Sequence, residues 1–258
     1  MAATSPTSSR RSSHRVAVVT GGAGGLGRAT AERLSRDGYA VALVDRSESV
    51  HDLCRELKLA KSVQLDVTDP GSVADAMADI AHELGGVDIL VNAAGVAHRS
   101  SFAATSADEF MADVRINLLG TFLTCQAAVY PHMRAAGHGR LINIASASAL
   151  LGGIGALGNG SGGRSGAGYA SSKAGVVNLT RWIAREVGPL GITSNVVSPG
   201  LVWTNMTEGQ STYDDLDIPL GRAADPAEIA SAVAWLASDD SAYVSGAVIA
   251  VDGGLTRA

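Results

Sequence analysis

The chain has 258 residues, of which 46% are hydrophobic and only 4% aromatic, and its formal net charge is −5. This charge gives no electrostatic reason to bind nucleic acid or an anionic membrane, and no apolar run approaches the ~20 residues that cross a bilayer. Two distant cysteines and six scattered histidines predict neither a disulfide framework nor a metal site.

The N-terminal segment 1–15 differs from the rest of the chain, because it is rich in Ser, Thr, Ala and Arg and has no acidic residue. No apolar segment follows its Arg10-Arg11 pair, so we interpret it as a disordered tail and not as an export signal. We expect residues 16–258 to form one cytoplasmic domain, since this length is close to the upper limit for a single core.

Apolar runs of strand length alternate with helical periodicity along the chain. The predicted strands are 16–19, 40–44, 62–65, 87–91, 140–144, 193–197 and 247–251. Asp69 before Pro70 marks a helix that Gly85-Gly86 ends, and Asp225 before Pro226 marks another. This alternation predicts an α/β fold with a doubly wound, seven-stranded parallel sheet and helices on both faces, interrupted by a glycine-rich loop at 152–168.

A glycine-rich turn, Thr20-Gly-Gly-Ala-Gly-Gly-Leu-Gly27, stands between the first strand and the next helix. Residues without side chains let the backbone approach a pyrophosphate, whose charge meets the free N–H groups of the helix N-terminus. A plain glycine loop is the alternative, but the place of the turn favours a dinucleotide site. The predicted contacts are Gly21, Gly25, Leu26 and Gly27.

Carboxylates end the second and third predicted strands. Asp45 can accept hydrogen bonds from the adenine ribose, and a 2′-phosphate a few Å away would cost on the order of 4 kcal/mol. Arg46 can partly offset this by pairing with a phosphate, and a simple turn aspartate is the alternative. We therefore favour NAD over NADP, with Asp66 and Val67 beside the adenine.

Tyr169 and Lys173 are four residues apart and so share one face of a predicted helix. An ammonium beside a phenol favours the phenolate, lowering a pKa that is ordinarily near ~10. Tyr169 then becomes a base that takes a hydroxyl proton while hydride leaves for a nicotinamide. The alternative is an exposed tyrosine beside a solvated lysine.

With these motifs in order, the chain from Val16 to Gly254 resembles the short-chain dehydrogenase/reductases. The resemblance implies a Rossmann fold and an NAD(P)-dependent enzyme that acts on a CH–OH group. It implies that Ser146 holds the substrate oxygen, that Asn117 positions a water that relays the proton outward, and that Lys173 also binds the nicotinamide ribose. It also implies a homotetramer and further cofactor-site residues, which are Asn92, Ala93, Gly95, Pro199, Gly200, Val202 and Thr204. Of these, Asn92 and Gly95 look structural and shape the floor of the cleft.

One departure from the family is the spacing of Ser146 and Tyr169, between which 22 residues stand where about a dozen are usual. The extra length is the glycine-rich stretch, and a mobile lid, a lobe of the pocket and an insertion without a role all remain open.

The substrate pocket is expected to involve His98, Ser148, Leu150, Trp203 and the segment 205–220, which carries Asp214, Asp215 and Asp217. These acids disfavour anionic substrates and favour a neutral secondary alcohol, a polyol or a ketone, although a solvated acidic loop explains them almost as well. Two other functions compete: an NADPH-dependent ketone or 3-oxoacyl reductase, and a non-catalytic dinucleotide sensor.

Overall fold

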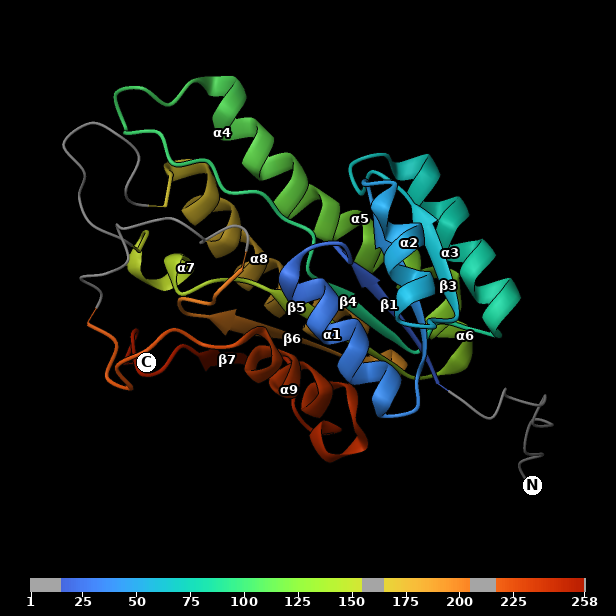
Figure 1. The fold of residues 1–258 in the computed structure, drawn as a ribbon. Coiled ribbons are helices and arrows are strands. Elements are labelled where there is room, and N and C mark those ends of the chain that lie inside the picture. Colours follow the sequence, from blue (N-terminus) through green and yellow to red (C-terminus); the bar gives the residue numbers. More distant parts are fainter. Residues whose placement is uncertain (1–14, 155–164, 205–216, 258) are drawn as a thin grey trace.

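The computed structural model describes residues 15–154, 165–204 and 217–257, so most of the N-terminal segment and of the glycine-rich stretch lies outside it. Seven parallel strands form one sheet in the order β3-β2-β1-β4-β5-β6-β7 (Figure 1). The strands are β1 (Val16–Thr20), β2 (Ala40–Asp45), β3 (Lys61–Gln64), β4 (Ile89–Asn92), β5 (Gly139–Ile144), β6 (Ile192–Pro199) and β7 (Val248–Val251). The predicted doubly wound parallel sheet is confirmed, with strand ends that differ by one or two residues.

Helices cover both faces of this sheet. They are α1 (Gly25–Arg36), α2 (Ser49–Glu56), α3 (Pro70–Leu84), α4 (Ala107–Asp113), α5 (Gly120–Ala127), α6 (Arg134–Ala136), α7 (Ser148–Leu151), α8 (Ala167–Val187) and α9 (Pro226–Ala237). The π-helical stretch η1 (Val114–Leu119) joins α4 to α5, whereas η2 (Ala128–Met133), between α5 and α6, is kinked at Tyr130, whose backbone is not helical. No helix within the described ranges is both long and apolar enough to cross a membrane.

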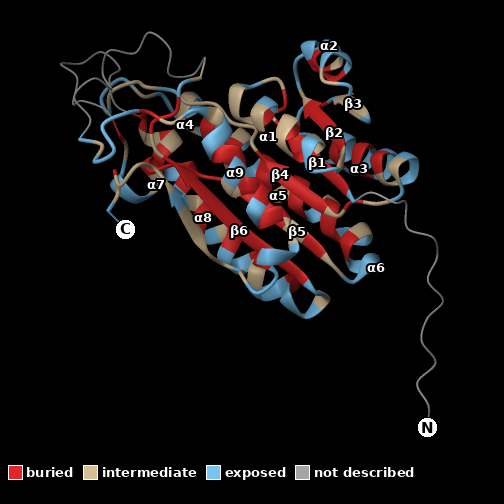
Figure 2. Cartoon of the chain, turned by 60° about the horizontal axis from the view of Figure 1, so that its bottom comes forward, coloured by how far each residue is buried: buried red, intermediate tan, exposed pale blue. Residues whose placement is uncertain are grey.

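The alternation of side chains along the strands produces two apolar layers. Val16 and Val18 of β1 face a core built with α3, α5 and α8, whereas Ala17 and Val19 face a core built with α1, α2 and α9. Figure 2 shows the strands buried along most of their length, and Figure 1 shows α1 and α9 side by side on one face. The sheet is therefore shielded on both faces, so a ligand can reach it only at an end or an edge.

Local capping explains where two of the helices begin. The Asp69 side chain accepts hydrogen bonds from the N–H groups of Gly71 and Ser72, and Asp225 forms a capping box with Glu228. Both predicted helix starts are confirmed. The prediction that the loop extends to Gly168 is wrong at its end, because α8 already begins at Ala167.

The order of the strands fixes the position of the site. β1 pairs with β2 on one side and with β4 on the other, so the chain changes direction across the sheet at this point. The connections that leave β1 and β4 at their carboxyl ends diverge there and open a crevice. The glycine turn follows β1, and the segment 93–99 follows β4, so both stand at this crevice.

Candidate active site

A continuous cleft lies at the carboxyl ends of the strands. Its larger part, about 330 Å³, is bordered by the glycine turn, and its smaller part, about 100 Å³, reaches the first turns of α8. The larger part is lined by Gly21, Gly24, Gly25, Leu26, Gly27, Asp45, Arg46, Asp66, Val67, Ala93, Ala94, Gly95, Val96, Ile116 and Thr204. The smaller part is lined by Leu26, Ala93, Gly95, Ile144, Ala145, Ser146, Tyr169, Lys173, Pro199, Gly200, Val202 and Thr204. Because four residues border both parts, the glycine turn and the Tyr169–Lys173 pair share one cavity.

The glycine turn is packed too tightly for side chains. A Cβ on Gly27 would lie 2.1 Å from the carbonyl oxygen of Gly21, and Gly21 itself has a φ of +66°, which favours glycine. Unlike α3 and α9, helix α1 has no side-chain cap, since its N-cap is Gly24, and no acidic residue stands in its first turn. No capping side chain therefore accepts from the N–H groups in the first turn of α1, which border the cleft. These groups can instead donate to the pyrophosphate of a dinucleotide.

Asp45 stands at the end of β2, on the border of the same cleft. Its Oδ2 accepts from the Ala23 N–H at 3.0 Å, and its Oδ1 accepts from the Ser47 N–H at 2.9 Å. These two bonds fix the carboxylate in place while each oxygen keeps a lone pair. The negative charge is thus held beside the glycine turn, where an adenine ribose would bind.

The other end of the cleft holds a hydroxyl, a phenol and an ammonium. Ser146 follows β5, and its Oγ accepts from the Ser148 N–H at 3.1 Å. Lys173 Nζ lies 5.9 Å from the ring centroid of Tyr169 and donates to the Ile144 carbonyl oxygen at 2.8 Å. The predicted neighbourhood of the phenol and the ammonium is therefore present, one helical turn apart on α8.

Burial makes the ammonium of Lys173 less stable, because its side chain is almost inaccessible to solvent. Desolvation lowers the pKa of Lys173 to about 8, and the nearby Asp113 carboxylate acts in the opposite direction. At neutral pH the ammonium is still the main form. A single proton at this site therefore responds to pH changes close to the physiological range.

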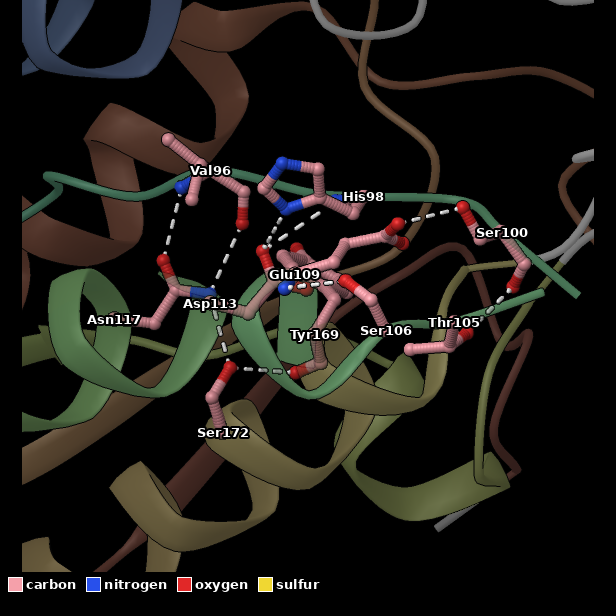
Figure 3. A network of polar contacts seen from close by, with 10 residues as sticks. All are labelled: Val96, His98, Ser100, Thr105, Ser106, Glu109, Asp113, Asn117, Tyr169 and Ser172. Carbon is pink, nitrogen blue, oxygen red and sulfur yellow. Dashed lines mark hydrogen bonds and ion pairs between the residues drawn. The ribbon is translucent and has the colours of Figure 1, made fainter. Parts of the chain in front are cut away.

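Asn117 lies within η1 and faces α8 (Figure 3). Its amide nitrogen donates to the Val96 carbonyl at 3.0 Å and to Ser172 Oγ at 2.9 Å, and its amide oxygen accepts from the Val96 N–H at 2.9 Å. The Asn117 side chain thus joins the segment after β4 to α8. Both of its amide hydrogens are used within the protein.

Most of the predicted site residues line this cleft, whereas Asn92 and Asn117 line neither part of it. The Asn92 side chain is buried in the core, where it donates to Asn143 Oδ1 at 2.9 Å and accepts from Thr124 Oγ1 at 2.7 Å. This arrangement fits the structural role expected for it and removes it from direct cofactor contact. The sequence reasoning missed Ile116, whose only signal was its place beside Asn117, and Gly24, Ala94 and Val96, which adjoin predicted residues.

The predicted substrate-pocket residues have different environments. Ser148 is fully buried, and its hydroxyl pairs with Ser165 Oγ at 2.9 Å, so the expectation that it lines the pocket is wrong. Trp203 is 58% exposed and Leu150 is 44% exposed, as groups at the mouth of a pocket can be. Asp217 forms an ion pair with Arg257, whereas Asp214 and Asp215 lie outside the described residues.

Comparisons with known proteins agree with this geometry. Residues 21–256 match the family described as enoyl-(acyl carrier protein) reductase. The chain is 39% identical to meso-2,3-butanediol dehydrogenase of Serratia marcescens, over 95% of this chain and 96% of the relative. It is 37% identical to 3-oxoacyl-(acyl carrier protein) reductase of Vibrio cholerae, over 93% and 97% of the two chains.

A third relative is cis-4-hydroxycyclohexanecarboxylate dehydrogenase of Sinomonas cyclohexanicum, which is 39% identical over 94% of this chain and 96% of its own. Among solved structures, the crystal structure of gox2181 superposes with a TM-score of 0.86 at 33% identity, covering 96% of this chain and 98% of the other. The chain belongs to the short-chain dehydrogenase/reductase family, whose members are nicotinamide-dependent oxidoreductases acting on alcohol and ketone groups.

Proposed function

We propose that this protein is an NAD-dependent dehydrogenase of a neutral secondary alcohol or polyol, which also catalyses the reverse reduction of the matching ketone. The observation that carries the proposal is the placement of Tyr169 and Lys173 beside Ser146, in the same cleft as the uncapped N-terminus of α1. A non-catalytic dinucleotide sensor would need the glycine turn but not this second set of residues.

The chain's own residues account for the acid–base chemistry. In the oxidising direction Ser146 Oγ holds the substrate oxygen, and the Tyr169 phenolate takes the hydroxyl proton from it. The Lys173 ammonium favours that phenolate electrostatically. When bound, the nicotinamide supplies the hydride acceptor in oxidation and the hydride donor in reduction.

The preference for NAD over NADP rests on Asp45. Its carboxylate is fixed by Ala23 and Ser47, so it cannot turn away from an incoming 2′-phosphate without breaking two hydrogen bonds. Arg46 borders the cleft too and offers a positive charge that a phosphate can use. We propose that repulsion by Asp45 outweighs attraction by Arg46, because the exposed arginine is well solvated.

The proposal of a neutral substrate rests on fewer acidic side chains than the sequence suggested. Asp217 is neutralised by Arg257, so its charge does not repel an anion on its own. The similarity to a butanediol dehydrogenase favours a small diol or secondary alcohol. The similarity to a hydroxycyclohexanecarboxylate dehydrogenase makes an alicyclic alcohol with a carboxylate the comparison substrate of choice.

A second candidate is an NADPH-dependent 3-oxoacyl reductase, which the similarity to the Vibrio cholerae enzyme favours. Asp45 opposes this alternative, and the preferred dinucleotide separates the two. We further propose that residues 16–258 act as one catalytic domain within a homotetramer, in the cytoplasm.

The test measures turnover of a panel of diols, secondary alcohols, hydroxycyclohexanecarboxylate and 3-oxoacyl thioesters. Each reaction is monitored by the absorbance of the reduced dinucleotide, once with NAD and once with NADP. We expect turnover of a neutral secondary alcohol with NAD⁺ and at most weak turnover with NADP⁺. The Asp45→Ser variant should shift the ratio of kcat/KM values toward NADP by about 100-fold, because it removes a like-charge repulsion. Preferred use of NADPH with an acyl thioester by the parent protein would instead establish the reductase.

A further inference from the structure

A tight turn at residues 252–256, which we call the C-terminal turn, directly follows β7. Asp252 Oδ1 accepts from the Gly254 N–H at 2.9 Å, and Asp252 Oδ2 accepts from the Thr256 N–H at 2.9 Å and from Thr256 Oγ1 at 2.6 Å. Gly254 has a φ of +87°, a conformation that favours glycine and helps to reverse the chain. The Asp252 carboxylate therefore holds the turn together, and Leu255 within it is buried.

The C-terminal turn packs against Gly200, which follows β6 and borders the smaller part of the cleft. A Cβ on Gly200 would lie 2.8 Å from Asp252 Cα and 2.9 Å from Asp252 Cβ, so the absent side chain lets the two segments touch. The Gly200 N–H also donates to the Val251 carbonyl oxygen at 3.1 Å. The backbone at this side of the cleft is therefore held by direct contact with the start of the turn.

Leu255 is 8% exposed and belongs to a small apolar cluster behind the cleft. The other members of this cluster are Ala147, Ile154, Leu201 and Ala223, with Ile218 packed against them. Ala147 directly follows Ser146, which lines the cleft, and Leu201 likewise stands between two residues that line it. Neither Ala147 nor Leu201 lines the cleft itself, so the cluster forms a layer behind the wall that carries the Ser146 hydroxyl.

The segment 217–223 is tied to the same turn. The Leu220 N–H donates to the Gly253 carbonyl oxygen at 3.1 Å, and Arg257 forms an ion pair with Asp217. The C-terminal turn thus connects the segments that follow β5 and β6 with the segment 217–223, beside the part of the cleft that holds the Tyr169–Lys173 pair.

The dinucleotide part of the cleft has different supports. The glycine turn, Asp45 and Asp66 border the larger part, and none of them belongs to the apolar cluster around Leu255. A loss of packing in this cluster should therefore displace Ser146 relative to Gly200 and leave the groups that suit a pyrophosphate and an adenine ribose in place.

Resting on the proposed function, we propose that Asp252 and Leu255 are positioning residues for the substrate. They hold the side of the cleft that carries Ser146 and Gly200, and thereby set the KM for the alcohol and the size of alcohol that fits. Their effect is indirect, because neither side chain borders the cleft. A displacement of about 1 Å at a reacting group can lower a rate ~100-fold, so packing behind this wall is sufficient to change the reaction.

The first test is Leu255→Ala, which removes packing behind the wall. We expect kcat/KM for a small acyclic diol to fall by about 10-fold, mainly through a higher KM, because Ser146 then binds the substrate oxygen less well. The dissociation constant of NAD⁺, measured by calorimetric titration, should stay within about 2-fold of the parental value. An alicyclic alcohol should lose less, so that the ratio of the two kcat/KM values shifts toward it by about 5-fold, because the wall can retreat from a larger ring.

Leu236→Ala is the matched control, because it deletes the same atoms from another buried leucine. Leu236 lies on α9, three residues before Asp239, which pairs with Arg15 at the start of β1. Both variants should have a lower unfolding midpoint, but Leu236→Ala should keep the parental KM and the parental preference between the two alcohols. Leu255→Met conserves the volume of the side chain and should restore KM to within about 2-fold of the parental value.

Asp252→Asn tests the turn without a cavity, because an amide nitrogen cannot accept from Thr256. We expect a smaller rise in KM, about 3-fold, and this variant decides if Leu255→Ala does not fold. An unchanged KM in the deciding variant would overturn the proposal, as would an equal rise in Leu236→Ala or a loss of NAD⁺ affinity as large as the rise in KM. Failure of the proposed function is distinguishable, since the parent protein would then oxidise no alcohol before any variant is made.

Discussion

The two ends of the sheet carry the same kinds of charged residue but use them differently. At the amino ends, a small hollow of about 120 Å³ is bordered by Arg15, Asp88, His138, Arg140 and Asp239. Asp88 binds His138 and accepts from the Val16 N–H at 2.7 Å, and Arg15 pairs with Asp239 at 2.7 Å. Each acid there pairs with a base, although Arg140 Nε has no hydrogen-bond partner among the described residues, and these pairs fix the start of β1.

At the carboxyl ends the matching is incomplete. Lys173 is buried and donates to the Ile144 carbonyl oxygen, which carries no full negative charge. One oxygen of Asp113 has no partner among the described residues, and the N-terminus of α1 lacks a capping side chain. Groups of this kind lower stability unless a ligand or a proton completes them. Polar groups at the amino ends of the strands therefore stabilise the fold, while those at the carboxyl ends remain available to a cofactor and a substrate.

The largest expected effect is that of Tyr169→Phe, which removes only the phenol oxygen from the cleft at the carboxyl ends of the strands. We expect kcat to fall by about 1,000-fold, because the general base is lost. The free energy of unfolding should change by less than about 0.5 kcal/mol, as for other substitutions that leave packing intact. Steady-state kinetics and denaturant unfolding measure the two quantities, and a variant with parental kcat would show that Tyr169 is not the base.

Gly27→Ala tests the glycine turn, since the added Cβ would lie 2.1 Å from the Gly21 carbonyl oxygen. We expect a loss of about 2 kcal/mol in the free energy of unfolding and at least a 10-fold weaker affinity for the dinucleotide. Gly188→Ala is the matched control, because a Cβ there meets nothing within 4 Å. Calorimetric titration and urea unfolding provide the measurements; equal behaviour of the two variants would contradict the tight turn.

Lys173→Met tests whether the buried ammonium at the carboxyl end lowers stability in a pH-dependent way. The pKa of Lys173 is lowered from 10.5 to about 8, so burial of the ammonium destabilises the folded state below pH 8, and this penalty disappears as pH rises toward 10.5. The stability advantage of the methionine variant over the parent should therefore shrink by about 2 kcal/mol between pH 7 and pH 9.5. Denaturant unfolding at both pH values measures this difference, and an advantage independent of pH would contradict the lowered pKa.

The smallest effect is expected at the amino end. Asp88→Asn weakens the ion pair with His138 and the bond to Val16, and we expect a loss of about 1 kcal/mol in the free energy of unfolding. Turnover should stay at the parental value because the cleft lies at the other end of the strands. A reduced kcat at unchanged stability would mean that the two ends are coupled.

Much of the fold and of the cofactor site could be predicted because the sequence motifs that mark them are local. The glycine turn, the Asp-Pro helix starts and the four-residue spacing of Tyr169 and Lys173 each depend on a few neighbouring residues. The strand ends shifted slightly where pairing decides them: β3 ends at Gln64, which pairs with Asp45, and not at the predicted Leu65. Asn92 and Ser148 were harder to place, because each is a polar residue whose partner lies far away in the sequence.

The sequence by itself determined the seven-stranded fold, the position of the cleft and most of the residues that border it, because hydrophobic periodicity and turn-forming residues are properties of short segments. Only the tertiary structure decided the charge balance of the site. Nothing near Asp113 in the sequence indicates that it is buried; its environment is made by His98 after β4 and Gly168 in α8. Burial and electrostatic environment arise where distant segments meet, and so they follow from packing and not from local pattern.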